Sequence, residues 1–315
     1  MLLDFLLFPV GLAGLFYGAE WLVDGAARIA ARLGVSKLLL GLTLVSFGTS
    51  APELLVGVVA SYQGNGSLAI GNVLGSNIAN IALILGVTAL ISGITVRREI
   101  VVRDIPIMIG FAILVPVFGV SGSISGVAGA ILLLLFVTYL GFLAVDARRQ
   151  SLDPERVIEE HQIDGPQHSL GRDLLLAVLG LVVLATGAEL LVNSAVAIAV
   201  TFDISEVVIG LTLVALGTSL PELAASISAA RRSEGEIVIG NVVGSNIFNV
   251  ALILGVSAIV RPIPISQTVL RVDAPIAIAI SALLLPLVLV NRRIYRWEGG
   301  ILLATYIGFL VWTAL

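Results

Sequence analysis

The segment GLTLVSFGTSAPELLVGVVASYQGNGSLAIGNVLGSNIANIALILG runs from Gly41 to Gly86 and returns as GLTLVALGTSLPELAASISAARRSEGEIVIGNVVGSNIFNVALILG from Gly210 to Gly255. The two copies align without a gap, and 27 of their 46 positions are identical. Chance similarity between apolar helices would share Leu and Val but not GTS, PE and GNVxGSN, so the chain contains an internal duplication. Each copy places one glutamate, Glu53 or Glu222, directly after a proline within an apolar segment. Because a carboxylate at membrane depth is energetically costly, this pair predicts one shared ion site.

The composition of the 315-residue chain is that of a membrane protein, with 58% hydrophobic and only 12% charged residues. Apolar segments of about 20 residues, the length that crosses a bilayer as a helix, recur from end to end, and we count ten candidates, five in each half. The first apolar run lacks a basic leader region and is interpreted as a spanning helix. Strands of a β-barrel would alternate apolar and polar residues, whereas runs such as 131–136 are apolar throughout. We predict an all-α polytopic membrane protein with ten transmembrane helices.

Basic residues are distributed unevenly between the two sides of these predicted helices. Of the 17 Lys and Arg residues, 15 lie in or beside the loops that follow odd-numbered helices, and only Arg261 and Arg271 lie on the other side. By the positive-inside rule, the basic side is cytoplasmic. We therefore expect a protein of the cytoplasmic membrane with its N-terminus and C-terminus outside.

The repeat extends over a whole half of the protein. A constant shift of 169 residues relates the two motifs and also matches the sequence at 104–106 with that at 273–275. Since each half has an odd number of spanning helices, the second half enters from the opposite side, which gives an inverted repeat. The predicted organisation is a five-helix repeat at 1–145, a polar cytoplasmic linker at 146–172 and a second five-helix repeat at 173–315.

A proline precedes the glutamate in each copy, as in the sequence Gly-Thr-Ser-Ala-Pro-Glu that ends at Glu53. Proline has no amide hydrogen, so we expect the helix to bend or break there and to free a backbone carbonyl. Thr49 and Ser50 precede Glu53 by four and three residues, which places their hydroxyls on its face of the helix. Thr218 and Ser219 repeat this arrangement before Glu222. The all-oxygen set suits a hard cation such as Ca²⁺, which takes about six to eight oxygen ligands.

The next apolar helix in each half carries a polar stripe, in which side chains recur every four residues on one face. We assign this stripe to the site, and its members are Asn72, Ser76 and Asn80 in the first half and Asn241, Ser245 and Asn249 in the second. Interhelical hydrogen bonding is the competing interpretation for Asn80 and Asn249.

Two further features of the same helices are interpreted differently. Glycines spaced by four residues are expected to allow close helix packing, and they are Gly71, Gly75, Gly240 and Gly244. Asn77 and Asn246 lie one residue off the polar stripe. They could cap carbonyls of the broken helices, and their role stays open.

Three other acids, Glu20, Asp24 and Glu189, lie in apolar segments. No helix breaker or hydroxyl cluster accompanies them, so a structural hydrogen bond, a lining of the aqueous pathway and a direct ligand all stay open. His161 and His168 lie in the polar linker, where a solvated histidine is the ordinary case, and they are given no role.

These motifs closely resemble those of the Ca²⁺/cation antiporter superfamily, and within it the prokaryotic Na⁺/Ca²⁺ exchangers, whose two repeats carry GTSxPE and GNxxGSN. The resemblance covers nearly the whole chain. It implies ten helices, a core of helices 2, 3, 7 and 8, a sliding pair of helices 1 and 6, and a functional monomer. The cation ligands that it implies are Thr49, Ser50, Glu53, Ser76 and Asn80 with Thr218, Ser219, Glu222, Ser245 and Asn249, plus the backbone oxygens of Ser46 and Ala215.

Two details of the resemblance concern the transported ions. Relatives that also carry K⁺ have Asp at the place of Asn249, as do some K⁺-independent prokaryotic members, so Asn249 favours K⁺ independence. Relatives that exchange Ca²⁺ for H⁺ typically have Asn-Ala-Ala before the first glutamate. Both copies here read Gly-Thr-Ser-x-Pro-Glu, which favours Na⁺ as the counter-ion.

The leading hypothesis is an Na⁺/Ca²⁺ antiporter that uses the Na⁺ gradient by alternating access, with Ca²⁺ and Na⁺ as substrates, lipid as its surroundings and no cofactor. A Ca²⁺/H⁺ antiporter and a cation channel that uses the same acidic residues stay as alternatives. An enzyme is disfavoured, because the chain has no cysteine, no histidine in an apolar segment and no nucleophile and base outside the Ser/Thr-Glu cluster. No basic stretch suggests a nucleic-acid partner.

Overall fold

The protein is a bundle of long helices, and its computed structural model describes residues 2–150, 169–202 and 217–314. The elements of the first half are α1 (Leu2–Leu33), α2 (Lys37–Leu40), η1 (Gly41–Val45), α3 (Ser46–Thr49), α4 (Ala51–Tyr62), α5 (Gly66–Ile78), η2 (Ala79–Leu85), α6 (Gly86–Ser92), β1 (Ile94–Thr95), η3 (Ile100–Asp104), α7 (Ile105–Gly119), β2 (Ser123–Ile124) and α8 (Gly126–Gln150), where η marks a π-helical turn. Those of the second half are α10 (Leu170–Thr201), α13 (Leu220–Arg231), α14 (Gly235–Phe248), η5 (Asn249–Leu254), α15 (Gly255–Val260), β3 (Ile263–Pro264), η6 (Val269–Asp273), α16 (Ala274–Leu289), β4 (Arg293–Ile294) and α17 (Arg296–Ala314).

Within the described residues, seven helices are long and apolar enough to cross a membrane. The segment from α2 to α3 and helix α4 together make an eighth, broken span with a 47° bend. The prediction of an all-helical, multi-pass membrane protein is therefore confirmed. The count of ten stays a prediction, because α17 is not among the seven and residues 203–216, which precede α13, lie outside the described part of the chain.

Two spans form the centre of the bundle, and each is a helix interrupted by a π-helical turn. The span Gly235–Val260 comprises α14, η5 and α15, and 94% of its most apolar 18-residue stretch is buried inside the protein. The equivalent span of the first half, Gly66–Ser92, comprises α5, η2 and α6, and 72% of the corresponding stretch is buried. Both carry the polar stripes identified in the sequence, and the stripe residues are buried except Asn72, which is half-buried.

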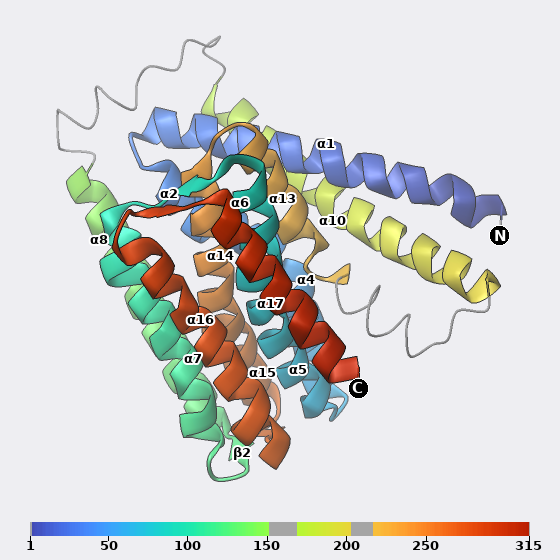
Figure 1. Ribbon diagram of the computed structural model, residues 1–315, viewed down its shortest axis with the longest axis vertical. Helices are drawn as coiled ribbons and strands as arrows, with labels where there is room; N and C mark the ends of the chain where they lie inside the picture. The colour runs from blue at the N-terminus through green and yellow to red at the C-terminus, as the bar shows by residue number, and fades with distance from the viewer. Residues whose placement is uncertain (1, 151–168, 203–216, 315) are drawn as a thin grey trace.

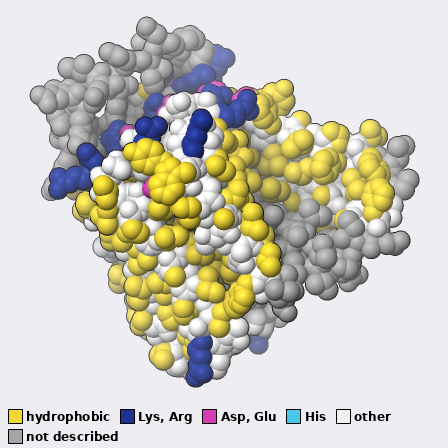
Figure 2. Space-filling view, viewed as in Figure 1, with side chains coloured by type: hydrophobic (Ala, Val, Ile, Leu, Met, Phe, Trp, Pro, Cys, Tyr) yellow, Lys and Arg dark blue, Asp and Glu magenta, His cyan; other side chains and the backbone are white. Residues whose placement is uncertain are grey.

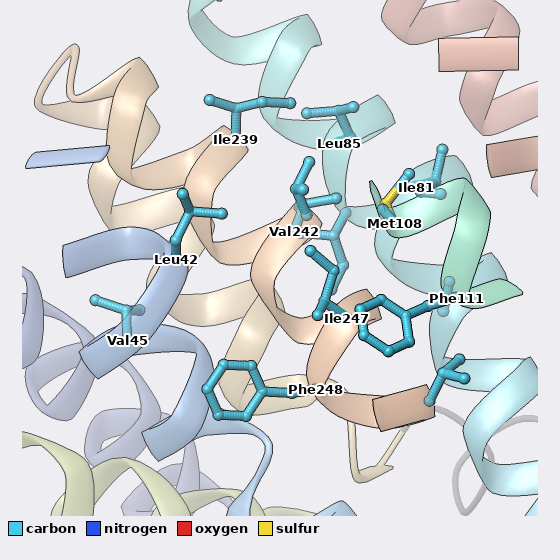
Figure 3. Close-up of a cluster of buried hydrophobic side chains, with 14 of the residues drawn as sticks. Leu42, Val45, Ile81, Leu85, Met108, Phe111, Ile239, Val242, Ile247 and Phe248 are labelled. Carbon is cyan, nitrogen blue, oxygen red and sulfur yellow. The ribbon is translucent and has the colours of Figure 1, made fainter. Parts of the chain in front are cut away.

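Buried apolar side chains from both halves pack around these central spans, as Figure 3 shows. Leu42 of η1 and Leu85 of η2 lie near Val242 and Ile239 of α14, and Met108 of α7 lies near Ile81. The two halves therefore share one hydrophobic core and do not form separate domains.

Helices α1 and α10 form a pair that crosses the other helices at a steep angle (Figure 1). Each is 32 residues long, and they contact each other extensively. Glycines make this contact close, since a Cβ added at Gly187 would lie 2.6 Å from the amide nitrogen of Leu15. The packing is thus backbone against backbone, as in membrane helix pairs with small residues at the interface.

Matched contacts between non-equivalent elements join the two halves. The 169-residue shift makes α15 the counterpart of α6 and α17 the counterpart of α8, and the observed packing pairs are α6 with α17 and α15 with α8. The short antiparallel strands pair in the same crossed manner, β1 with β4 and β2 with β3. Such an exchange is what a two-fold rotation between the halves requires, and it agrees with the predicted repeat.

The surface reflects the predicted charge asymmetry. Lys and Arg side chains gather mostly at the upper end of the face in Figure 2, whereas hydrophobic side chains cover most of the remainder.

Helix α8 continues to Gln150 and α10 begins at Leu170, so helical structure extends into both ends of the segment predicted as a linker. The intervening residues 151–168, which include His161 and His168, lie outside the described residues.

We expect Gly187→Ala to destabilise the protein by about 1–3 kcal/mol, because the added methyl group would meet backbone atoms of α1 that cannot rotate away. Thermal unfolding in detergent measures this effect. Gly141→Ala on α8 is the matched control, because Gly141 is exposed and no described atom lies within 4 Å of its added Cβ. An equal loss in the two variants would contradict the close packing of α1 on α10.

Candidate cation site

Two helix breaks deliver the repeat-equivalent glutamates to the interior. Helix α3 ends at Thr49 and α4 begins at Ala51, so the break falls at Ser50, which has φ −83° and ψ 6°. The second copy matches it, since α13 begins at Leu220 after Ser219, with φ −88° and ψ 4°. In each copy the proline occupies the first turn of the new helix, where its missing amide hydrogen costs least. The predicted break before Glu53 is confirmed, and in the second copy α13 begins at the equivalent residue, although residues 203–216 before it lie outside the described part of the chain.

Glu53 and Glu222 lie in the first turns of α4 and α13 and are only 1% and 2% exposed. Each glutamate follows a break of its helix, Glu53 at Ser50 and Glu222 at Ser219. A hydrogen bond joins the two repeats, in which Ser50 Oγ of the first half donates to Glu222 Oε1 of the second at 2.9 Å. Thr218 and Ser219 occupy the equivalent positions in the second half, but neither carboxylate oxygen of Glu53 accepts a hydrogen bond from a described residue. The two copies of the motif thus meet in one place.

Several buried oxygen atoms around these glutamates accept no hydrogen bond from any described residue. They are Glu53 Oε1 and Oε2, Glu222 Oε2, Asn80 Oδ1, Asn249 Oδ1 and Ser245 Oγ. Buried polar atoms are nearly always hydrogen-bonded, because leaving them unpaired costs free energy. These six atoms belong to residues that the sequence assigned to the site, and the same condition holds for five further described atoms, on Ser61, Asp173, Ser228, Glu236 and Ser257. A hard cation with about six to eight oxygen ligands is the partner that this donor set fits.

The charge of the site comes from the two glutamates alone. Within the described residues there is no group of three or more His, Cys, Asp or Glu side chains that could hold a metal ion. Neither Glu53 nor Glu222 forms an ion pair with a described Lys or Arg. Neutral hydroxyls and amides complete the surroundings, so the site is suited to a mobile cation and not to a permanently bound basic side chain.

Asparagines at the start of each polar stripe bind the backbone of the glutamate-bearing helices. Asn72 Nδ2 donates to the carbonyl oxygen of Glu53 at 3.3 Å, and Asn241 Nδ2 donates to that of Glu222 at 3.4 Å. Asn241 also accepts a hydrogen bond from Thr49 Oγ1 at 3.3 Å. These two asparagines therefore position α4 and α13 against the central spans.

The other predicted backbone and hydroxyl ligands differ in how far the structure describes them. Ser46 is fully buried, its hydroxyl donates to the carbonyl of Gly41 at 2.6 Å, and its own carbonyl accepts from the Ser50 amide at 3.0 Å. Ser76 lies beside Ser219, with 3.4 Å between their hydroxyl oxygens. Ala215, the counterpart of Ser46, lies outside the described residues.

The three additional acids do not join this site. Glu20 forms an ion pair with Arg232 at 3.8 Å, and Asp24 pairs with the same guanidinium. Glu189 is exposed on α10. Among the alternatives that the sequence left open, Glu20 and Asp24 therefore act as structural ion-pair partners between α1 and the end of α13.

Asn77 and Asn246 donate to backbone carbonyls, as the sequence analysis suggested, but sequence reasoning did not identify which carbonyls these are. Their side chains are buried and bond to each other's backbone across the two halves, at 3.3 Å in both directions. They also accept hydrogen bonds from Asn249 and Asn80. Their equivalence under the 169-residue shift was the available signal, but the pairing itself depends on which helices meet.

Two of the four glycines expected to allow close helix packing, Gly240 and Gly244, do so in the structure. A Cβ added at Gly240 or Gly244 would lie 2.8 Å from the carbonyl oxygen of Leu38 or Leu42, so these glycines allow close packing. Gly71 and Gly75 have no described atom within 4 Å of an added Cβ. The segment equivalent to Leu38–Ser46, at 207–215, lies outside the described residues.

The fold and the site together define a multi-pass membrane protein with two carboxylates buried where the copies of a duplicated helix motif meet. The protein family described as "Sodium/calcium exchanger protein" matches residues 3–145 and 173–315. The chain belongs to this family, whose members are transporters. The resemblance drawn from the sequence motifs is thereby confirmed.

Individual relatives match over the whole length of the chain. The sodium/calcium exchanger MaX1 of Methanosarcina acetivorans is 36% identical over 344 residues, which cover 98% of this chain and 97% of that protein. The inner membrane protein YrbG of Escherichia coli is 35% identical over 318 residues, which cover 100% and 97%. A solved structure of the sodium-calcium exchanger NCX_Mj, soaked with 2.5 mM Na⁺ and 0.1 mM Ca²⁺, aligns with a TM-score of 0.84 at 37% identity and covers 98% and 97%.

Proposed function

We propose that this protein is a sodium/calcium antiporter that binds Na⁺ and Ca²⁺ alternately at the site formed by Glu53 and Glu222. The observation that carries the proposal is the set of buried oxygen atoms without hydrogen-bond partners on the two buried glutamates and on residues of the neighbouring polar stripes. One Ca²⁺ balances the charge of both carboxylates. Adding Na⁺ to a Ca²⁺-loaded site would crowd positive charge, so the two ions compete and exchange.

The proposed ligand set extends over both repeats. Glu53, Glu222 and the oxygen atoms of Asn80, Asn249 and Ser245 form its buried centre. The remaining members are Thr49, Ser50, Ser76, Thr218 and Ser219, with the backbone oxygens of Ser46 and Ala215. Ca²⁺ and Na⁺ are both hard cations, and this set offers them oxygen atoms alone.

The proposed topology has ten transmembrane helices in two inverted five-helix repeats, with both termini outside the cytoplasmic membrane and the polar linker inside. The crossed contacts of α6 with α17 and of α15 with α8 support a two-fold relation between the repeats. The proposed protein functions as a monomer, because one chain encodes both copies of the motif that form the site.

Na⁺ is the proposed counter-ion, without a requirement for K⁺. Both copies of the motif retain Gly-Thr-Ser-x-Pro-Glu, and residue 249 is Asn, which keeps the number of carboxylates at two. The sodium/calcium exchanger MaX1, similar over nearly its whole length, supports this choice.

Vesicle flux tests the exchange directly. Purified protein in Na⁺-loaded vesicles is expected to take up ⁴⁵Ca²⁺ when diluted into Na⁺-free medium, and the uptake should vanish when the Na⁺ gradient is collapsed. Glu53→Gln and Glu222→Gln should each abolish it, whereas Glu189→Gln on the exposed face of α10 should not.

Other results of this assay would indicate a different counter-ion, a channel or a different site. Uptake driven by a pH gradient without Na⁺ would assign H⁺ as the counter-ion. Uptake that requires internal K⁺ would contradict K⁺ independence, and Ca²⁺ entry without counter-flux would indicate a channel. Unchanged uptake in both glutamine variants would rule out the assigned site.

Ca²⁺ binding should also be visible as a gain in thermal stability. A ligand that binds the folded state stabilises it by about 2.7 kcal/mol at 100 times its dissociation constant. We expect Ca²⁺ to raise the unfolding temperature of the detergent-solubilised protein and Glu53→Gln to remove this rise. Without Ca²⁺, Glu53→Gln should be at least as stable as the wild type, because a buried neutral amide costs less than a buried carboxylate that accepts no hydrogen bond. A full Ca²⁺ response in Glu53→Gln would contradict the site, and Glu189→Gln is the control that should respond normally.

A further inference from the structure

Four buried asparagines form a symmetric hydrogen-bond network where the two central spans meet. They are Asn77, Asn80, Asn246 and Asn249, each at most 3% exposed. Asn77 Nδ2 donates to the backbone oxygen of Asn246, and Asn246 Nδ2 donates to that of Asn77, both at 3.3 Å. Asn80 Nδ2 then donates to Asn246 Oδ1, and Asn249 Nδ2 donates to Asn77 Oδ1, both at 2.9 Å.

The two backbone carbonyls determine the orientation of all four amides. A carbonyl oxygen can only accept a hydrogen bond, so the NH₂ groups of Asn77 and Asn246 must face it. Their Oδ1 atoms are then left as acceptors, and they take hydrogen bonds from the NH₂ groups of Asn249 and Asn80. The backbone carbonyls therefore decide which end of each side-chain amide carries the oxygen and which the NH₂ group.

These hydrogen bonds leave the side-chain oxygen of Asn80 and that of Asn249 without a donor. Asn80 Oδ1 and Asn249 Oδ1 are buried and accept no hydrogen bond from a described residue. An asparagine that could rotate would present its NH₂ group to a cation as readily as its oxygen, and the NH₂ group repels a cation. Fixing the amide in advance removes that wrong orientation and the entropy cost of choosing the right one.

We propose that Asn77 and Asn246 are positioning residues for the cation, because they orient the amide oxygens of Asn249 and Asn80, respectively, toward it. This inference rests on the proposed function. Each ligand is held by the opposite repeat, since Asn77 of the first half orients Asn249 of the second, and Asn246 orients Asn80. Groups that orient metal ligands typically change metal affinity about 10- to 100-fold when removed.

A double-mutant cycle separates this role from simple attachment between helices. Ca²⁺-dependent thermal stabilisation gives the half-maximal Ca²⁺ concentration for Asn77→Ala, Asn249→Ala and the double variant, and the unfolding temperature without Ca²⁺ is recorded separately. We expect Asn77→Ala to raise the half-maximal concentration at least about tenfold. In the Asn249→Ala background, the same substitution should add nothing, because the amide that it orients is already gone.

The chain offers a matched control for this cycle. Asn77→Ala leaves the backbone carbonyl of residue 77 in place, so Asn246 and Asn80 keep their hydrogen bonds. In the Asn80→Ala background, Asn77→Ala should therefore still raise the half-maximal concentration by its full factor. Asn77→Ser, and the mirror cycle of Asn246→Ala with Asn80→Ala, serve if the first variant does not fold.

The outcomes distinguish this inference from the proposed function. A wild-type protein with no Ca²⁺ response would overturn both. The positioning role alone would be overturned if the wild type responded normally but the double variant raised the half-maximal Ca²⁺ concentration by the product of the factors for Asn77→Ala and Asn249→Ala. The positioning role would also be overturned if Asn77→Ala lowered the unfolding temperature without changing the half-maximal Ca²⁺ concentration.

Discussion

Two buried carboxylates without a basic partner among the described residues are the constraint on which the structure depends. Ionising a buried carboxylate is costly unless a positive charge joins it, and Glu53 and Glu222 are both buried. Among the described residues, no Lys or Arg forms an ion pair with either glutamate. The resting arrangement is therefore held together only in part by the protein, and the missing charge must come from solution. A transporter uses this dependence, because an ion that completes a site can also leave it.

The helix breaks and central asparagines follow from that constraint. A continuous helix through Ser50 would use its backbone groups internally and would not turn the glutamate toward the opposite repeat. The 47° bend allows Ser50 to reach Glu222. The π-helical turns η2 and η5 occur where Asn80 and Asn249 lie, in keeping with the frequent use of such turns at functional sites. Local irregularity is thus concentrated where ligands are needed, and regular helix surrounds it.

Much of the site could be predicted because its chemistry is local in sequence. Proline, hydroxyls and carboxylate fall within a single turn before Glu53, and helical spacing alone puts them on one face. The role of Asn77 could not be predicted in this way, because its partner is 169 residues distant and periodicity describes only one helix at a time. Glu20 shows the same limit, since the Arg232 that pairs with it lies in the other repeat. The all-helical membrane fold followed from composition, but crossed packing of α6 on α17 is a tertiary property.

The crossed pairing of the repeats also has a consequence for biosynthesis. The first half leaves the ribosome 169 residues before its counterpart, and at about 5–20 residues per second that interval is on the order of ten seconds or more. Throughout it, strand β1 lacks β4, helix α6 lacks α17 and the side chain of Asn80 lacks its acceptor. The contacts between the halves therefore form only after the second half has been synthesised, whereas contacts within the first half, such as those of α4 with α5, can form before.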